Sequence, residues 1–199
     1  MQSGAHFFLN WVKERIDEMD AALASLESKV GEIRADSPMK ADQFIADLRK
    51  KRDEFERRAQ KQAEAGEAAW DVAKAQLDTE WKAFEAEMRK YVEAFARDVR
   101  QQQSVFQSQG QAQIHALRET ADKIHAAAAQ FTAERRKDVD ASVSRMRAEA
   151  TAAEGKLRKI AEAKTESWPT LSAALTETRA AFDRTNQAAR EAFKQAVRQ

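Results

Sequence analysis

Apolar residues recur at alternating steps of four and three positions along most of the chain, which is the spacing of a helix that packs against another helix. The first such run is unbroken and comprises Val12, Ile16, Met19, Leu23, Leu26, Val30 and Ile33. A β-strand would require strict alternation of apolar and polar residues, and this run shows none. The spacing therefore predicts an all-α protein made of long amphipathic helices.

The composition excludes several other classes of protein. The 199 residues include only 5 glycines and 2 prolines, and no cysteine. So few glycines argue against a nucleotide-binding α/β domain or a turn-rich β-sandwich, and the lack of cysteine excludes disulfides and thiolate metal sites. No apolar run approaches the ~20 residues that a membrane-spanning helix needs. Because 34 basic residues are balanced by 33 acidic ones, nucleic acid is not an expected partner.

The two prolines mark expected helix boundaries. Ser37 is a favourable N-cap, and Pro38 suits the first helical position, where its missing N–H costs nothing. Pro169 disfavours the α conformation at Trp168, which predicts a second boundary at that point. The helices expected at the two ends of the chain are therefore 5–35 and 170–197.

The long middle part of the chain contains one neutral stretch. Residues 101–117 carry no charged side chain and include Ser108 and Gly110, and glycine is common where a helix ends. We therefore expect a turn at 107–110 between two long helices, over 38–107 and 111–166. One continuous helix through the whole stretch is the alternative that the sequence leaves open.

These helix lengths predict an architecture. The two long helices would form an antiparallel coiled-coil hairpin, and the shorter helices at the chain ends would fold back along its open end. The result would be a four-helix base with a protruding two-helix stalk, so that residues 1–199 form a single elongated domain. Gly155, which lies among Ala, Glu and Lys, is expected inside a helix at a cost of about 1 kcal/mol.

Aromatic residues are the candidate interaction sites. A two-helix seam backed by alanine cannot cover all the aromatic area on the predicted stalk, and exposed apolar patches usually mark binding surfaces. The candidate surface comprises Trp70, Trp81, Phe84, Tyr91, Phe95 and Phe106. A second apolar patch comprises Phe7, Phe8 and Trp11. It would either close a packed base and a dimer interface or insert into a lipid or polymer surface.

The residue patterns do not indicate catalysis. The glycines are isolated, so the sequence has no phosphate-binding loop. Asp122 and His125 resemble half of a carboxylate-bridged di-metal motif, but the other half is missing. Glu85 is expected to pair with Arg89, one turn away on a solvated helix face. We therefore expect no enzyme activity, no metal and no cofactor.

Helices rich in Ala, Glu and Lys with periodic aromatic residues resemble two groups of proteins. One is the small bacterial coiled-coil proteins of uncharacterised function. The other is the phasins and apolipoprotein-like proteins, which implies a hydrophobic granule or lipid surface as partner. The resemblance is compositional, covers the whole chain and carries no functional residue with it.

The sequence thus predicts a non-enzymatic coiled-coil scaffold that binds other proteins, as a homo-oligomer or with a helical partner. A phasin-like coat on a lipid or polymer-granule surface is the alternative. Residues 1–10 have no Lys or Arg before the short apolar run Phe7-Phe8-Leu9, so we expect no secretory signal and a cytoplasmic location.

Overall fold

The computed structural model describes residues 3–28, 30, 38–64, 69–95, 99–163 and 167–198. Within these residues the chain forms six α-helices and no strand, which confirms the predicted all-α class. The helices are α1 (Ser3–Glu27), α2 (Pro38–Ala63), α3 (Trp70–Ala94), α4 (Val99–Ala128), α5 (Ala133–Ala163) and α6 (Trp168–Arg198).

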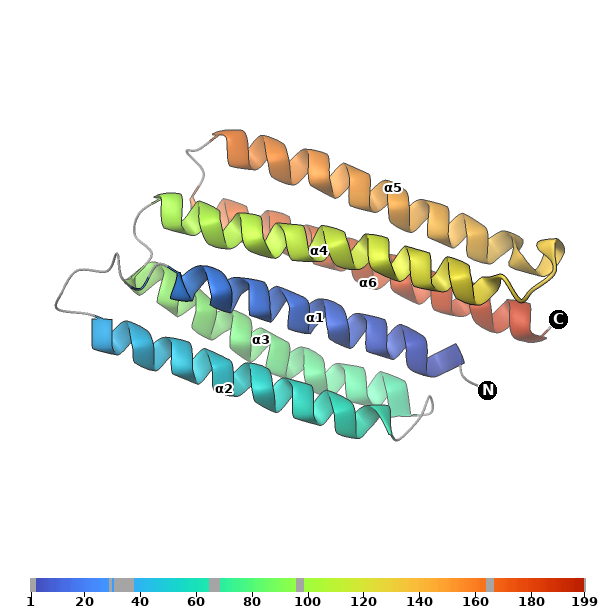
Figure 1. Ribbon diagram of the computed structural model, residues 1–199, viewed down its shortest axis with the longest axis horizontal. Coiled ribbons are helices and arrows are strands. Elements are labelled where there is room, and N and C mark those ends of the chain that lie inside the picture. The colour runs from blue at the N-terminus through green and yellow to red at the C-terminus, as the bar shows by residue number, and fades with distance from the viewer. Residues whose placement is uncertain are drawn as a thin grey trace.

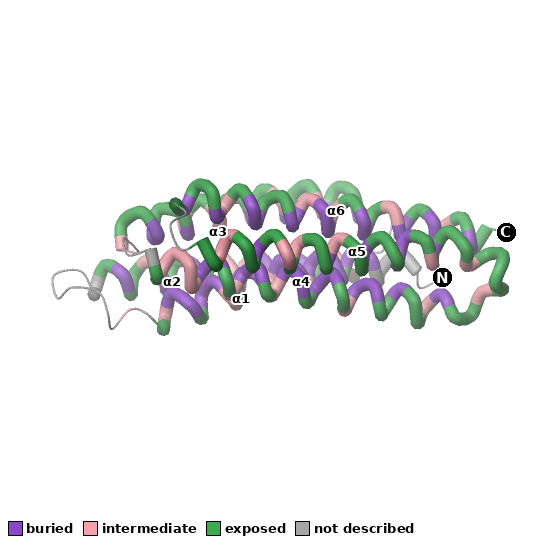
Figure 2. Tube along the Cα trace, turned by 90° about the horizontal axis from the view of Figure 1, so that it is seen from above, coloured by how far each residue is buried: buried purple, intermediate pink, exposed green. Residues whose placement is uncertain are grey.

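The six helices run alternately in opposite directions along an elongated bundle (Figure 1). The start of α1 and the end of α6 lie at the same end of this bundle. α1 packs against α2, α4 and α6. The outer helix α2 packs against α1 and α3, and the outer helix α5 packs against α4 and α6. Buried residues line the inward sides of the helices (Figure 2) and form one hydrophobic core.

The second half of the chain repeats the pattern of helices and buried positions of the first half. The repeat interval is the sequence separation from Trp70 to Trp168, which equals that from Phe84 to Phe182. All four of these side chains are buried. The same interval carries α1 onto α4, α2 onto α5 and α3 onto α6, and most positions buried in one helix are buried in its counterpart. We therefore describe α1–α3 as the first unit and α4–α6 as the second unit of a repeated three-helix structure.

Both boundaries marked by proline are confirmed. α2 begins at Pro38, and α6 begins at Trp168 with Pro169 in its first turn. The N–H of Leu171 donates to the carbonyl oxygen of Ser167 at 3.1 Å, which starts the hydrogen-bonding ladder of α6. The expected N-cap Ser37 lies outside the described residues. The first helix is shorter than the predicted helix 5–35, because α1 ends at Glu27.

The predicted turn at 107–110 is wrong, because these residues lie inside α4. About half of the neutral stretch around them is buried, which explains the lack of charge at those positions, whereas its other positions are partly or fully exposed. Gln109 and Gln113 are buried, where an unpaired charge would lose its hydration at high cost. Gly110 allows close packing of α4 against α5, since a Cβ atom there would lie 2.8 Å from Leu157 Cδ1.

The predicted long helices are also wrong. The predicted helix 38–107 is divided into α2, α3 and the start of α4, and the helix 111–166 is interrupted at 129–132, between α4 and α5. The segment 129–132 contains neither glycine nor proline, but it ends in Thr132, a residue type favoured at helix N-caps. A six-helix bundle therefore replaces the predicted two-helix stalk on a four-helix base.

Two glycines allow a matched test of this packing. Replacing Gly155 by alanine should stabilise the protein by about 1 kcal/mol, because alanine is the better helix former and open space surrounds the position of the new Cβ. The same change at Gly110 should gain less or destabilise, because its methyl group would displace Leu157. Urea denaturation measures the difference. Equal gains at both positions would show that α4 and α5 approach less closely than described.

Candidate functional site

A group of charged side chains is buried between α1, α3 and α6. Glu14, Arg15 and Glu18 of α1 are at most 1% exposed, and Arg179 of α6 is 7% exposed. Such residues are seldom buried unless they are paired. We call the group the ionic cluster and define it as Glu14, Arg15, Glu18, Trp81, Glu85, Arg179 and Asp183.

Arg179 connects the two units. Its Nε donates to Glu18 Oε2 at 3.1 Å, and its Nη1 donates to Glu85 Oε1 at 3.1 Å. The pairing of Glu85 differs from the prediction, because this carboxylate reaches Arg179 of α6 rather than Arg89 on its own helix. A single guanidinium therefore holds α6 to both α1 and α3.

Arg15 makes a second connection between the units. It pairs with the adjacent Glu14, and its Nη2 donates to Asp183 Oδ2 on α6 at 2.9 Å. Trp81 of α3 faces both arginines, with its ring centroid 4.5 Å from the Arg179 guanidinium carbon and 5.6 Å from that of Arg15. The negative face of an indole ring stabilises a nearby cation. Charge pairing and ring contacts thus both hold the arginines in the core.

Glu14 is a carboxyl of the ionic cluster whose pKa is raised. Burial raises its pKa to about 7, because desolvation outweighs the attraction of Arg15, and the negative charge of Glu18 adds to the rise. Its Oε1 atom has no hydrogen-bond partner among the described residues. Burial lowers the pKa of Arg179, but Glu18 and Glu85 outweigh that effect and raise it above the ordinary range. Arg179 therefore keeps its charge while Glu14 titrates near neutral pH.

An apolar pocket of about 340 Å³ lies between α1, α4 and α6, near the start of α1 and the end of α6. Most of its surface is hydrocarbon, and Asn10 and Lys123 are its polar residues. We call it the terminal pocket; it is lined by Phe7, Asn10, Lys123, Ile124, Ala126, Ala127 and Phe193. Small-molecule sites in proteins have this size and this mostly apolar lining.

A third group has the residue types of a metal site. Oxygen and nitrogen atoms of Asp17, His115 and Glu119 lie within 4.8 Å of one another. Lys13 pairs with Asp17, and its Nζ lies 3.0 Å from Glu119 Oε2. A hydrogen bond from Lys123, assisted by Lys13, lowers the pKa of Glu119 to about 2. Because two ammonium groups already neutralise these carboxylates, we assign no metal to them.

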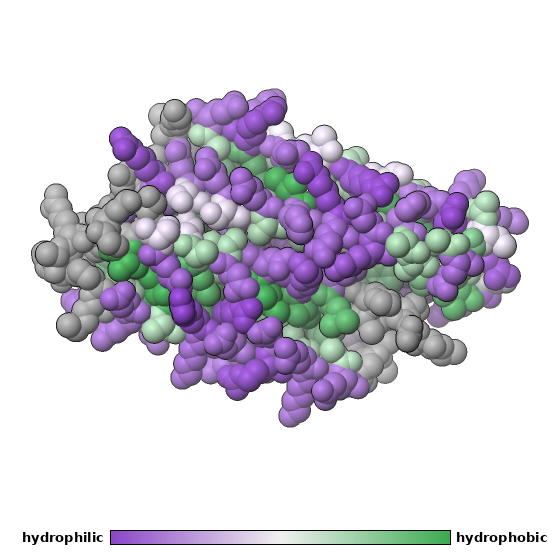
Figure 3. All heavy atoms as spheres, in the orientation of Figure 1, coloured by the Kyte–Doolittle hydropathy of each residue, from purple (hydrophilic) through white to green (hydrophobic). Residues whose placement is uncertain are grey.

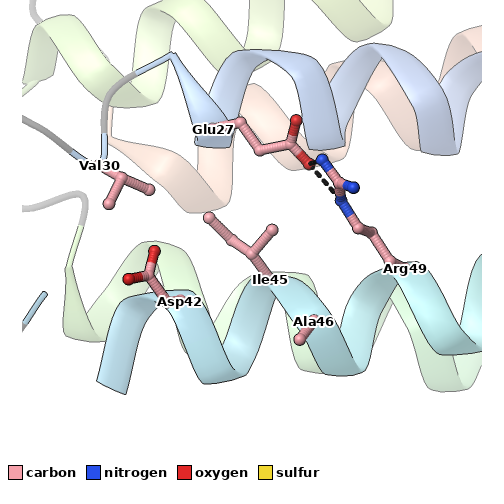
Figure 4. Close-up of a pocket in the computed structure, with 6 residues that line it drawn as sticks. All are labelled: Glu27, Val30, Asp42, Ile45, Ala46 and Arg49. Carbon is pink, nitrogen blue, oxygen red and sulfur yellow. Dashed lines mark hydrogen bonds and ion pairs between the residues drawn. The ribbon is translucent and has the colours of Figure 1, made fainter. Parts of the chain in front are cut away.

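An open groove of about 400 Å³ separates the end of α1 from the start of α2 (Figure 4). Glu27 and Arg49 form an ion pair of 2.6 Å across it. The apolar side chains of Val30 and Ile45 line the groove beside this pair. The ion pair connects the two walls of the groove, so this feature is a contact between neighbouring helices.

Of the six aromatic residues predicted on an exposed stalk, five lie in the core and the sixth packs against it. Five are buried, namely Trp70, Trp81, Phe84, Tyr91 and Phe106. Phe95 is partly buried and packs against Phe44 with a ring-centroid distance of 5.6 Å. The prediction of exposure is wrong because the predicted helix 38–107 folds back on itself, so that α2 and side chains of α6 cover α3. Phe106 lies on α4, which packs against α1, α5 and α6.

The apolar patch at the start of α1 is also internal. The Phe7 ring lies 5.8 Å from that of Phe193 on α6, and the Phe8 ring lies 5.2 Å from that of Trp70 on α3. Trp11 is completely buried. These side chains therefore close one end of the bundle, and the dimer interface that was predicted with them stays a prediction.

The residues of the incomplete di-metal motif pair with α5. Arg147 donates to Asp122 at 2.8 Å, and His125 Nδ1 lies 3.4 Å from Asp140 Oδ1. All four lie on the surface where α4 and α5 meet. They act as helix–helix contacts, which a pattern confined to one helix could not reveal.

Comparison of the chain with family models, with curated proteins and with solved structures found no match. Among the described helices, none has the length and apolar character needed to cross a membrane.

Titration of Glu14 predicts a pH-dependent effect of Glu14→Gln. The raised pKa of Glu14 means that the folded state holds a proton that the unfolded state loses, so wild-type stability falls as pH rises from about 4.5 to about 7. The variant lacks this loss. Its stability relative to wild type should therefore increase over that window, by up to about 3 kcal/mol.

Urea denaturation at a series of pH values measures this effect, with Glu93→Gln on the exposed side of α3 as the matched control. The control makes the same chemical change at an exposed carboxylate outside the ionic cluster, so it measures the effect of the substitution itself. A Glu14→Gln variant that loses stability relative to wild type as pH rises would contradict the assignment of a protonated Glu14.

Proposed function

We propose that this chain is a non-enzymatic interaction protein that works as a closed helical bundle and binds another protein through its outer surface. The observation that supports this proposal most is the ionic cluster. Its buried charges favour a bundle that stays closed over one that opens onto a lipid or polymer granule. A cytoplasmic location is part of the same proposal, in keeping with a chain without cysteine.

The inner faces of the helices are poorly suited to a hydrophobic surface. A coat of the phasin or apolipoprotein kind would have to turn these faces toward hydrocarbon. Glu18 lies on the inner face of α1, and Arg179 lies on that of α6. If the bundle opened, each would face hydrocarbon without the partner that it has in the core, and a buried charge without a partner is costly. This cost favours the closed bundle.

The outer surface suits a protein partner. The face in Figure 3 is mainly hydrophilic, and hydrophobic residues are visible between the hydrophilic ones. Exposed ion pairs such as Arg118–Glu154, at 2.6 Å, cross between neighbouring helices and contribute little to stability. Polar surfaces of this kind occur in non-obligate protein–protein interfaces. The partner in this proposal is a helical protein, and a second copy of the chain is the simplest case.

Flotation with phospholipid vesicles and with hydrophobic polymer granules tests the proposal. The wild-type protein should stay in the soluble fraction with unchanged helicity. Replacing the buried pair by apolar residues, in Glu18→Leu with Arg179→Met, should increase the floating fraction, because the inner faces of α1 and α6 then lack these charges. Such replacements often leave folding intact.

The matched control carries the same two changes at an exposed pair, Glu154→Leu with Arg118→Met. It adds the same apolar groups on the outside of the bundle and should float less than the core variant. Wild-type protein that floats and gains helicity would contradict the proposal and favour the coat protein.

A further inference from the structure

The terminal pocket has the construction of a small-molecule site. Phe7 and Phe193 supply two aromatic rings to its wall, and Ile124 and Ala127 supply aliphatic groups. The two rings are held edge to face at 5.8 Å by contact with each other, so part of the wall is formed in advance. The small side chain of Ala127 leaves room between α4 and α6 for a narrow hydrocarbon group.

The polar residues of the terminal pocket suit a hydrogen-bond acceptor. Asn10 is 7% exposed, and its Nδ2 atom has no acceptor among the described residues. A buried donor without an acceptor costs free energy, which an oxygen atom supplied by a ligand would recover. Lys123 is exposed, and its ammonium group is the second donor at the pocket; its Nζ also lies 2.8 Å from Glu119 Oε1, one turn earlier on α4.

The repeat shows that the Asn10 amide and the Lys123 ammonium group occur at one end of the bundle and are replaced by other groups at the corresponding positions. The interval between the units carries Asn10 onto Ser108 and Ser25 onto Lys123. Of these two counterparts, Ser25 has a partner between α1 and α4 at the other end of the bundle, because its Oγ lies 3.0 Å from Ser104 Oγ. The terminal pocket thus has an amide and an ammonium group where its counterpart has hydroxyl groups.

We propose that the terminal pocket binds a medium-chain acyl carboxylate. The chain would lie against Phe7, Ile124 and Phe193, and the carboxylate would accept hydrogen bonds from Asn10 and Lys123. A carboxylate is favoured over a neutral head group because bonds from an ammonium group to an ionised acceptor are the stronger kind. This inference goes beyond the proposed function, since the pocket is separate from the outer surface that binds the partner.

Isothermal titration calorimetry with sodium decanoate, below its critical micelle concentration, tests this inference on the full chain. Wild type should bind one decanoate, and butyrate should bind at least about tenfold more weakly because it covers less of the wall. Ala127→Phe, which fills the pocket, should weaken decanoate binding at least about tenfold. The control Ala152→Phe adds the same ring at an exposed position on α5 and should bind decanoate like wild type.

The head group is tested with 1-decanol and Lys123→Gln. This variant should lose about tenfold in affinity for decanoate and keep its affinity for decanol. Phosphatidylglycerol vesicles distinguish a free acyl carboxylate from the acyl chain of a membrane lipid, and binding to vesicles without binding to decanoate would overturn the proposal. Absence of saturable decanoate binding, or equal binding by Ala127→Phe and wild type, would overturn it as well.

Discussion

The guanidinium of Arg179 is a buried charge that joins the two units of the bundle. It lies in the core, paired with Glu18 of α1 and Glu85 of α3, and faces the ring of Trp81. A charge at this depth is tolerated only while its partners stay in place. Apolar contacts between helices can be exchanged for similar ones when a helix slides, but these ionic contacts cannot. The relative positions of α1, α3 and α6 are thus fixed together.

The repeat explains why this interaction exists in one place. Arg179 occupies the position in the second unit that Trp81 occupies in the first, and Gln113 corresponds to Arg15. In the second unit α4 and α6 pack closely, whereas in the first unit α1 and α3 approach each other much less. The Arg15 guanidinium lies in that wider space, with the Trp11 ring centroid 5.0 Å away on one helix and Trp81 on the other. Two similar units have thereby acquired different interiors.

The sequence predicted what single helices determine and missed what depends on several helices together. The helical class and the boundaries at Pro38 and Trp168 follow from local propensity and spacing. The break at 129–132 lacks glycine and proline, and the local signal it offers is Thr132, a residue type favoured at helix N-caps. In the sequence, Glu14 and Arg15 look like an ordinary surface pair, because the heptad seam marks only one face of α1 as buried. The packing of α1 against α2, α4 and α6 buries several faces of this helix. Comparison of the chain with itself would have revealed the three-helix repeat.

A double-mutant cycle on Glu18 and Arg179 tests directly whether this buried pair holds the two units together. The free energy of unfolding is measured for wild type, for Glu18→Leu, for Arg179→Met and for the double variant. Each single change should destabilise by about 3 kcal/mol or more, since it leaves a buried charge without its partner, whereas the double change should cost far less than the sum. Additive effects of the two changes would show that Glu18 and Arg179 do not depend on each other, and would contradict this account.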